Sequence, residues 1–524
     1  METLSSTIDT LCERLDIDLA KVADTLSYDA TQPLLFNTGL FLILFVLFVA
    51  VYRMLRPWRT VRMLFTIAFS LYFYYKSSGL CTLILLGVAV ADYLLGLLMG
   101  RTGGNARRRA IVGVNIALNV GMLIYFKYFT LIADTISQVF SAHIDPLHLL
   151  MPAGISFFTF RSISYMVDLY RGVLQPCRNM LHYVFFLTFF PPLLAGPVVR
   201  AKDMLPQIAA DPVPTRDMVS EGVWLIMLGI VKKMVIADFI SGNFVDRVFD
   251  NPALYSGFEN LMASFGFTIQ LYCDFSGYSD MAIGIALLLG YRFGENFNAP
   301  FKAQNPTEFW HRWHISLSTW LRDYVYIPLG GNRCSRPRSY FNLLATMVVG
   351  GIWHGASWMY VIWGVAHGVL LVSHKIIRSL LPEPVAVAAG ASGSTPEIAV
   401  GAPRRAIEPM VRVANMMFMF LLVSAAFMVF RCTSMENVEM MFNQILFSFH
   451  PGVAGQFVNG YPAIVLAMAV AFVVHLLPDS FTAPVRRCFL AAPVPVQALM
   501  LALALLVAIQ VRSSDIVPFI YLQY

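Results

Sequence analysis

The sequence predicts an all-α protein that crosses a membrane many times. Three observations support this fold class. Hydrophobic residues make up 58% of the 524-residue chain and charged residues 13%, about half the share that soluble domains carry. Mean hydropathy is +0.66. Apolar stretches recur from residue 36 to the end of the sequence, as expected for a chain organised as successive spans.

Thirteen apolar stretches are candidate membrane helices. A full crossing needs about 20 apolar residues, so the shorter stretches predict re-entrant or buried helices, and we expect about eleven or twelve full crossings. The longest stretch could cross twice, but Asp274 and Asp280 interrupt its middle. In chain order the stretches are 36–52, 61–75, 80–99, 110–133, 149–170, 181–197, 218–241, 258–290, 340–353, 358–378, 411–430, 461–477 and 497–512.

Basic residues in the connecting loops predict the orientation. Arginine clusters at 53–62 and 101–109 follow the first and third stretches, and such clusters normally stay in the cytoplasm. The acidic segment 1–35 is then extracytoplasmic. The net charge of +6 is modest and forms no basic face, which excludes a nucleic-acid-binding protein.

Composition divides the chain into four parts. An acidic extracytoplasmic head spans 1–35, and the membrane core spans 36–381. Segment 382–410 is rich in Ala, Gly, Pro and Ser, so it predicts a flexible cytoplasmic linker. Closing transmembrane helices and an aromatic C-terminal motif occupy 411–524. The seven cysteines are irregularly spaced and form no CxxC, so they indicate neither a disulfide framework nor a thiolate metal site.

Polar residues concentrate between about 270 and 370, and polar side chains in apolar surroundings usually mark the working part of a membrane protein. Asp274 and Asp280 belong to the first cluster, 273–301. They could cap a helix break or pair with an arginine, or they could form an ion or proton path. Gly277, Asn298 and other backbone-shaping residues favour the structural interpretation.

The second cluster spans 305–333. Residues 305–307, Asn-Pro-Thr, predict a helix start, after which Glu308, His311 and His314 would share one face. A metal site is conceivable there. However, HExxH is absent and no further ligands complete a coordination shell, so a structural role is favoured and no metal is predicted. A heavy aromatic component is typical of an interface or a cavity wall, and it consists of Trp310, Trp313 and Trp320.

The third cluster, 350–368, contains His354 between Trp353 and Gly355. A lone histidine can be a packing residue, but small residues on both sides suggest that something approaches this ring closely. A neutral imidazole in a site of low dielectric can act as a general base. His367 is interpreted as a packed or helix-capping histidine.

Together these clusters resemble the membrane-bound O-acyltransferase (MBOAT) superfamily, and most closely its bacterial alginate O-acetylase branch, which also resembles the teichoic-acid D-alanyl transfer protein. The resemblance covers roughly residues 35 to 380. The matching segments are DFSGYSDMAIG (274–284), ENFNAPF (295–301), NPTEFWHRWHISLSTWLRDYVYIPLGGNR (305–333), GGIWHGASW (350–358), MPAGISFFTF (151–160) and FFPPLLAGPVVR (189–200).

The resemblance implies a ring of about 11–12 transmembrane helices, with re-entrant and amphipathic helices, around a central funnel or tunnel. The family's active-site histidine falls on His354, and its second characteristic polar position falls on His314. We expect the substrate and donor cavity to be lined by Trp310, Trp313, Trp320, Trp353, Asp274 and Asp280. The chain ends FIYLQY, whereas relatives of this branch commonly end close to FIYFQF, and we expect packing or partner contacts there.

The resemblance also implies an activity. The protein would move an acetyl group from a cytoplasmic donor, acetyl-CoA, across the bacterial inner membrane for O-acetylation of an exopolysaccharide such as alginate or cellulose. No cofactor would be bound permanently. The expected partners are a periplasmic or membrane-anchored acetyltransferase of serine-hydrolase-like fold, the polysaccharide synthesis machinery and membrane lipid. No GxSxG motif is present, which favours a ternary complex over a covalent acyl-enzyme.

A second class of function stays open at this point. A polytopic transporter or polysaccharide-export component could use Asp274, Asp280 and the histidines as an intramembrane proton relay. Transporters commonly repeat such motifs in two related halves, whereas here they occur once, in one third of the chain. Acyl transfer from labelled acetyl-CoA would favour the enzyme, and a coupling-ion requirement without acyl turnover would favour transport.

Overall fold

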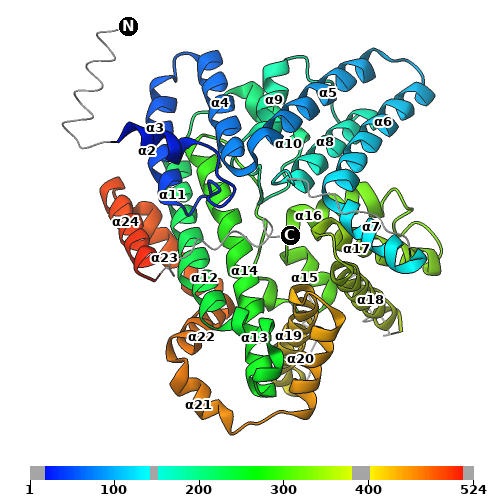
Figure 1. Cartoon of the computed structure of the whole chain (residues 1–524), viewed down its shortest axis with the longest axis vertical. Coiled ribbons are helices and arrows are strands. Elements are labelled where there is room, and N and C mark those ends of the chain that lie inside the picture. Colours follow the sequence, from blue (N-terminus) through cyan, green and yellow to red (C-terminus); the bar gives the residue numbers. More distant parts are fainter. Residues whose placement is uncertain (1–17, 142–150, 381–401, 512–524) are drawn as a thin grey trace, which may run out of the picture. The chain divides into compact units, whose positions relative to one another are not determined.

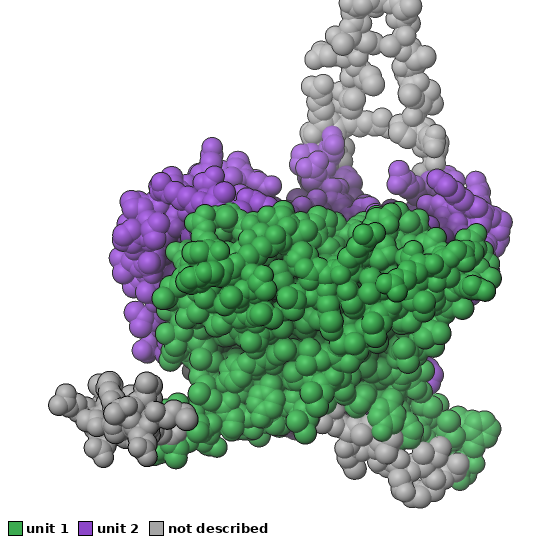
Figure 2. Space-filling view, turned by 90° about the horizontal axis from the view of Figure 1, so that it is seen from above, with its two compact units in different colours: residues 1–195, 199–214, 289–291 green, residues 196–198, 215–288, 292–524 purple. Residues whose placement is uncertain are grey.

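The structure is a computed structural model that describes residues 18–141, 151–380 and 402–511. These residues form α-helices with short 3-10 and π-helical segments and contain no strand, which confirms the all-α class (Figure 1). The chain divides into two compact units (Figure 2). Unit 1 comprises Met1–Ala195, Val199–Pro214 and Leu289–Tyr291, and unit 2 comprises Gly196–Val198, Thr215–Leu288 and Arg292–Tyr524. The boundary therefore falls inside the predicted 36–381 core.

Unit 1 is held together by polar bonds between its helices. Asp92 on α5 accepts hydrogen bonds from Asn115 on α6 (2.7 Å) and from the Tyr183 hydroxyl on α9 (2.9 Å). Such bonds satisfy polar groups that would be costly in an apolar interior. The elements are α2 (Leu19–Leu26), α3 (Gly39–Met54), α4 (Arg59–Ser78), η1 (Gly79–Cys81), α5 (Thr82–Arg101), α6 (Asn105–Leu123), η2 (Ile124–Tyr128), α7 (Phe129–Phe140), α8 (Ile155–Tyr170), α9 (Met180–Thr188) and α10 (Ala201–Ala210).

Unit 2 contains the second and third polar clusters of the sequence and all of the first except Leu289–Tyr291. Its first elements are α11 (Arg216–Ile230), η3 (Val231–Ala237), α12 (Asp238–Ile240), η4 (Ser241–Val245), α13 (Asp246–Asp250), η5 (Pro252–Leu254), α14 (Gly257–Leu288), η6 (Pro300–Lys302), α15 (Pro306–Arg312), α16 (Ile315–Leu321) and η7 (Arg322–Tyr326). They are followed by α17 (Arg336–His354), α18 (Trp358–Leu380), α19 (Ala402–Arg431), α20 (Met435–Phe447), α21 (Val453–Gly460), α22 (Pro462–Leu476), α23 (Asp479–Ala491) and α24 (Val494–Val511).

Glycines allow α11 and α14 to lie side by side in close contact (Figure 1). A Cβ atom at Gly229 would lie 2.5 Å from the carbonyl oxygen of Gly277, and one at Gly284 would lie 2.6 Å from that of Gly222. Small residues at a helix interface let backbones approach in this way, which is typical of membrane bundles. The glycines thus explain the close contact between α11 and α14.

The α14 helix continues unbroken through Asp274 and Asp280, so the predicted interruption is wrong. The carboxylates pair with lysines rather than with an arginine. Lys233 lies 2.5 Å from Asp274 and 2.7 Å from Asp238, and Lys232 lies 2.7 Å from Asp280. Removing one partner of a buried pair costs about 3–5 kcal/mol because the remaining charge is left uncompensated. These ion pairs therefore explain why a helix that carries two aspartates stays intact.

By length and hydropathy, five helical segments of the described residues could cross a membrane, or six with one pair that bends by 93°. They are Arg59–Arg101, Asn105–Phe140, Trp358–Leu380, Glu408–Arg431, Val494–Val511 and the bent pair Val453–Gly460 with Pro462–Leu476. The protein is therefore a multi-pass membrane protein. The number of crossings stays a prediction, because several predicted spans form shorter helices with buried polar side chains, such as Arg161 and Asp168 on α8.

The parts outside the core are described only in places. α19 begins at Ala402, inside the predicted linker 382–410, and residues 382–401 of that linker lie outside the described residues. The described portion of the 1–35 head contains α2. The aromatic C-terminal motif, 519–524, also lies outside the described residues.

Candidate active site

His314 lies at a break between two short helices. The Asn305 side chain accepts a hydrogen bond from the Glu308 N–H (2.9 Å), so the predicted helix start is confirmed. This helix, α15, ends at Arg312, and His314 adopts the left-handed conformation with φ of 43° before α16 begins. Glu308, His311 and His314 therefore do not share one helical face, and that prediction is wrong. The turn at His314 gives its ring a different direction.

The loop 295–304 satisfies the backbone groups that the break leaves open. The Asn298 N–H donates to the Arg312 carbonyl (2.9 Å), and the Ile315 N–H donates to the Asn296 carbonyl (2.8 Å). The Arg312 guanidinium also donates to the Asn298 carbonyl (3.1 Å) and pairs with Glu308 (2.9 Å). The break is thus built into the fold, since buried backbone groups need such partners.

The His314 ring is completely buried, with 0% exposure. Its Nδ1 lies 3.1 Å from Asn296 Oδ1, and its Nε2 has no hydrogen-bond partner within the part of the chain that the structure describes. The Phe275 ring packs edge-on against it at 4.6 Å between centroids. His314 lies outside the apolar spans given above, and burial lowers the pKa of its imidazole to about 3. The ring is therefore neutral, with one nitrogen available as an acceptor or base.

His354 is the last residue of α17 and is 4% exposed. Its ring lies among aromatic rings, with centroids 5.0 Å from Trp353, 4.9 Å from Trp363 and 5.3 Å from Phe430. The His314 ring lies 5.9 Å from the same Trp353 ring. The structure thus brings both predicted histidines to one tryptophan, although they come from segments about forty residues apart in the sequence.

The small residues around His354 have a structural explanation. A Cβ atom at Gly355 would lie 2.2 Å from the Tyr360 ring, and one at Gly351 would lie 2.3 Å from the Tyr360 carbonyl oxygen. The group that approaches these glycines is therefore helix α18 of the protein itself. The nearby His367 is packed as expected, with its ring 4.7 Å from Trp363 and 5.2 Å from Trp310.

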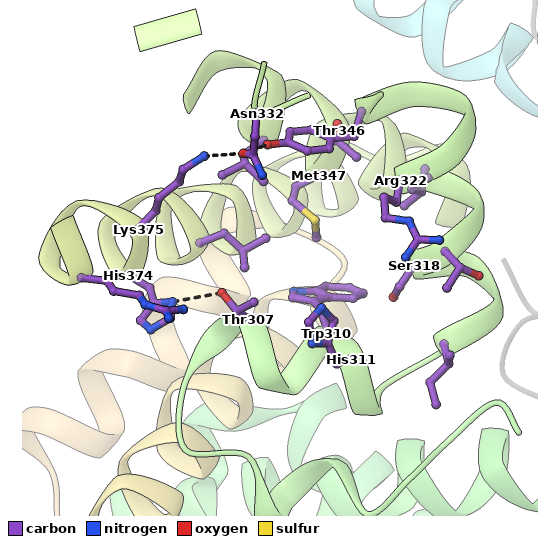
Figure 3. Close-up of a pocket in the computed structure, with 17 residues that line it drawn as sticks. Thr307, Trp310, His311, Ser318, Arg322, Asn332, Thr346, Met347, His374 and Lys375 are labelled. Atoms are coloured by element: carbon purple, nitrogen blue, oxygen red, sulfur yellow. Dashed lines mark hydrogen bonds between the residues drawn. The ribbon is translucent and has the colours of Figure 1, made fainter. Parts of the chain in front are cut away.

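Unit 2 contains a pocket of about 510 Å³ (Figure 3). Residues from α15 to α18 form its wall: Thr307, Trp310, His311, Ile315, Ser318, Thr319, Leu321, Arg322, Tyr326, Asn332, Leu343, Thr346, Met347, Leu371, His374, Lys375 and Arg378. Three of these side chains are cationic, and none of the described lining residues is acidic. The pocket therefore favours an anionic ligand with an apolar part.

Polar bonds fix part of the pocket wall. Lys375 Nζ donates to Asn332 Oδ1 (2.7 Å) and to Ser339 Oγ (2.6 Å), while His374 Nδ1 lies 3.0 Å from Thr307 Oγ1 (Figure 3). Neither His314 nor His354 belongs to the wall. Ile315, next to His314, and Met347, two turns before His354 on α17, do belong to it, so both histidine-bearing segments contribute to the pocket.

Of the six other residues expected to line a cavity, Trp310 lines this pocket. The other three tryptophans, Trp313, Trp320 and Trp353, are buried and pack against aromatic rings. Asp274 and Asp280 are engaged in the lysine pairs described above. Within the described residues, no group of three or more His, Cys, Asp or Glu side chains could hold a metal ion.

Sequence reasoning missed Asn296, Arg322, Lys375 and Arg378. Asn296 lies in the segment ENFNAPF, where its burial is not visible from the residue type. Lys375 and Arg378 come at the end of an apolar stretch, and this position suggests only a helix terminus at the membrane surface. Lys375 and Arg378 could have been found from their spacing of three residues, which puts two cations on one face of the helix after His354.

An all-helical membrane fold, two buried histidines and a pocket for an anionic, partly apolar ligand built from the same segments fit a membrane-embedded acyltransferase. Comparison with known proteins agrees: residues 176–397 match the model of MBOAT, the membrane-bound O-acyltransferase family. This region contains both histidines and the whole pocket. The chain belongs to the membrane-bound O-acyltransferase family.

Two relatives are similar over about two thirds or more of the chain, and a third over a shorter part of it. A protein named probable alginate O-acetylase AlgI, from Pseudomonas aeruginosa, is 38% identical over 79% of this chain and 75% of its own length. A peptidoglycan O-acetyltransferase from Helicobacter pylori is 36% identical over 65% of this chain and 70% of its own length. A teichoic acid D-alanyltransferase from Bacillus subtilis is 31% identical over 45% of this chain and 62% of its own length. The protein is therefore an enzyme of acyl transfer, which decides between the two classes that the sequence left open.

Proposed function

We propose that this protein transfers an acetyl group from acetyl-CoA to a hydroxyl acceptor, for O-acetylation of an exopolysaccharide such as alginate or cellulose at the bacterial inner membrane. The observation that carries this proposal is the cationic pocket formed by the same segments that hold His314 and His354. Relatives named as alginate O-acetylase and peptidoglycan O-acetyltransferase support acetyl as the acyl group and a glycan as the final acceptor.

The pocket suits the donor in charge and in position. Coenzyme A carries several phosphate groups, and Lys375 and Arg378 provide two cations for them, while Trp310 and Met347 provide apolar surface for the pantetheine arm. Arg322 also lines the pocket, but it pairs with Asp323 (2.8 Å). Asn332 in the pocket wall adjoins the basic segment 333–338, for which loop charge predicts a cytoplasmic position. This prediction supports access to the pocket from the cytoplasm.

The reaction needs one base. The acceptor oxygen attacks the thioester carbonyl carbon while His354 takes the hydroxyl proton, and the new C–O bond replaces the C–S bond. The coenzyme leaves as thiolate and takes up the proton. A positioned general base typically contributes 10²–10⁴-fold. His314 orients the acceptor hydroxyl beside His354, and burial of both rings excludes water, which would otherwise hydrolyse the thioester.

The acceptor lies on the opposite side of the membrane from the donor. We propose that the acetyl group reaches the polymer through a periplasmic or membrane-anchored acetyltransferase of serine-hydrolase-like fold, working with the polysaccharide synthesis machinery. The lack of a GxSxG motif in this chain supports direct transfer to an incoming hydroxyl rather than a covalent acyl-enzyme of its own.

Neutralising the pocket cations should weaken donor binding. We expect Lys375→Gln and Arg378→Gln each to raise the KM for acetyl-CoA about tenfold, because each removes a charge-assisted contact worth about 1.5 kcal/mol. Acetyl-pantetheine lacks the nucleotide phosphates, so its KM should change less than twofold if the cations bind those phosphates. Initial rates of the purified variants with both donors make the measurement.

Arg336→Gln is the matched control, because Arg336 is exposed on the neighbouring helix and does not line the pocket. Its KM for acetyl-CoA should stay at the wild-type value. An equal rise in KM with acetyl-CoA and with acetyl-pantetheine would show that the cations support the fold and do not bind phosphate. A KM for acetyl-CoA that none of the variants changes would place the donor elsewhere.

A further inference from the structure

We infer that Asn296 is a positioning residue that holds His314 as the tautomer with its proton on Nδ1 and its lone pair on Nε2. The inference rests on the proposed function, since it assigns a role to a histidine of that site. Asn296 does not touch the pocket, and it acts through the imidazole ring.

Asn296 is 2% exposed and bonds to three separate parts of unit 2. Its Nδ2 donates to Ser279 Oγ on α14 (3.0 Å). Its Oδ1 lies 3.1 Å from His314 Nδ1 and accepts from the Ser316 N–H (3.2 Å) and the Ser316 hydroxyl (2.8 Å) on α16. One amide side chain therefore ties the histidine to the rigid helix α14.

The orientation of this amide follows from its partners. A backbone N–H can only donate, so the Asn296 atom that faces the Ser316 N–H must be the oxygen. The Ser316 hydroxyl is compatible with this orientation, because Ser316 Oγ accepts from the Val198 N–H (2.9 Å) and can turn its proton toward Asn296. The Ser316 N–H thus fixes Oδ1 on the side of His314.

The position of this oxygen decides the tautomer. An amide oxygen only accepts, so a hydrogen bond at 3.1 Å requires the proton on His314 Nδ1. In a neutral ring the lone pair is then on Nε2, the nitrogen that has no hydrogen-bond partner among the described residues. The opposite tautomer would place two lone pairs against each other and leave a buried acceptor unpaired, which is unfavourable.

The backbone supports the same assignment. His314 has φ of 43°, a conformation that is costly for a residue with a Cβ, and such outliers persist where the surroundings determine them. Here the surroundings are the Asn296 carbonyl, which accepts from the Ile315 N–H, and the Asn296 side chain. Asn296 thus determines both the position of the His314 ring and which ring nitrogen carries the proton.

The tautomer also decides what His314 can do. An Nε2 lone pair can accept a hydrogen bond from a second O–H or N–H group of the acceptor, whereas stabilising a negatively charged oxygen would require an Nε2–H donor. We therefore assign His314 to positioning the acceptor through a group other than the hydroxyl whose proton His354 takes. The His354 base would then receive a hydroxyl whose oxygen is already directed at the thioester.

The test combines tautomer spectroscopy with a pH profile. In protein labelled with ¹⁵N histidine, the signals of His314 are identified by their loss in His314→Asn. We expect wild-type protein to show a protonated Nδ1 and an unprotonated Nε2, and Asn296→Ala to show a mixture. We expect Asn296→Ala to lower kcat about tenfold at unchanged KM for acetyl-CoA, since an unoriented group loses part of its effect.

Asn296→Asp provides the conservative variant and a signed prediction. A carboxylate also accepts from Nδ1–H, so the tautomer should be retained and kcat should recover near neutral pH. A negative charge beside the ring stabilises the imidazolium and raises the pKa of His314. Activity needs the neutral ring, so activity that is lost by protonation of His314 should be lost at a higher pH than in wild type. Asn298→Ala, an exposed residue of the same loop, is the control and should change neither readout.

A wild-type spectrum with the proton on Nε2, or an Asn296→Ala spectrum identical to wild type, would overturn the inference. So would an Asn296→Asp protein of normal abundance in which Nε2, and not Nδ1, carries the proton. A purely structural role would lower abundance and leave the tautomer and the profile unchanged. The tautomer is measured without turnover, so this failure is distinct from failure of the proposed function, in which His314→Asn itself would keep full activity.

Discussion

His354→Ala is expected to abolish acyl transfer while leaving a folded protein in the membrane. The ring lies at the C-terminal end of α17, so its removal breaks no helix and leaves only a small void among Trp353, Trp363 and Phe430. A positioned general base contributes 10²–10⁴-fold, so the loss of activity should far exceed any loss of abundance.

The measurement is acetylation of the polymer in cells, normalised to the amount of each variant in the membrane. His450→Ala is the control, because His450 is exposed on a loop of the same unit. It should keep wild-type acetylation. Near-normal acetylation by His354→Ala at normal abundance would show that His354 is not the base.

His314→Asn is expected to lower kcat about 10²-fold, the usual cost of losing the orientation of a reacting group. Asparagine is the better replacement than alanine here, because it tolerates the left-handed conformation that His314 adopts. The KM for acetyl-CoA should change little, since His314 does not line the donor pocket.

Initial rates over a range of acetyl-CoA concentrations, up to saturation, separate kcat from the KM for acetyl-CoA. A raised KM for acetyl-CoA at unchanged kcat would place His314 in donor binding and contradict its role toward the acceptor. The loss should also be smaller than that of His354→Ala, because an orienting group contributes less than the group that takes the proton.

Properties determined by composition and local sequence could be predicted. High hydropathy without strand patterning indicated helical spans. The Asn-Pro-Thr segment at 305–307 marked a helix start, because capping depends on residues a few positions apart. The WHG and WHISLS segments indicated His354 and His314, and the structure brings both rings to Trp353.

Properties determined by distant partners could not be predicted. Asp274 suggested a helix break, but Lys233, 41 positions earlier (274 − 233), pairs with it and keeps α14 intact. The continuous helical face expected for Glu308, His311 and His314 fails because the Asn296 loop binds the chain at His314. The glycines beside His354 accommodate Tyr360, so they carried no information about substrate.

The most direct test of the account is transfer of label from [¹⁴C]acetyl-CoA in inverted membrane vesicles from polymer-producing cells. Their cytoplasmic face is exposed to the donor. We expect label to appear on the glycan, to persist when an ionophore collapses the ion gradients, and to be lost in vesicles with His354→Ala. Contradiction would come from vesicles that transfer no label while the polymer is acetylated in the intact cells, or from transfer that requires an ion gradient and is unaffected by His354→Ala.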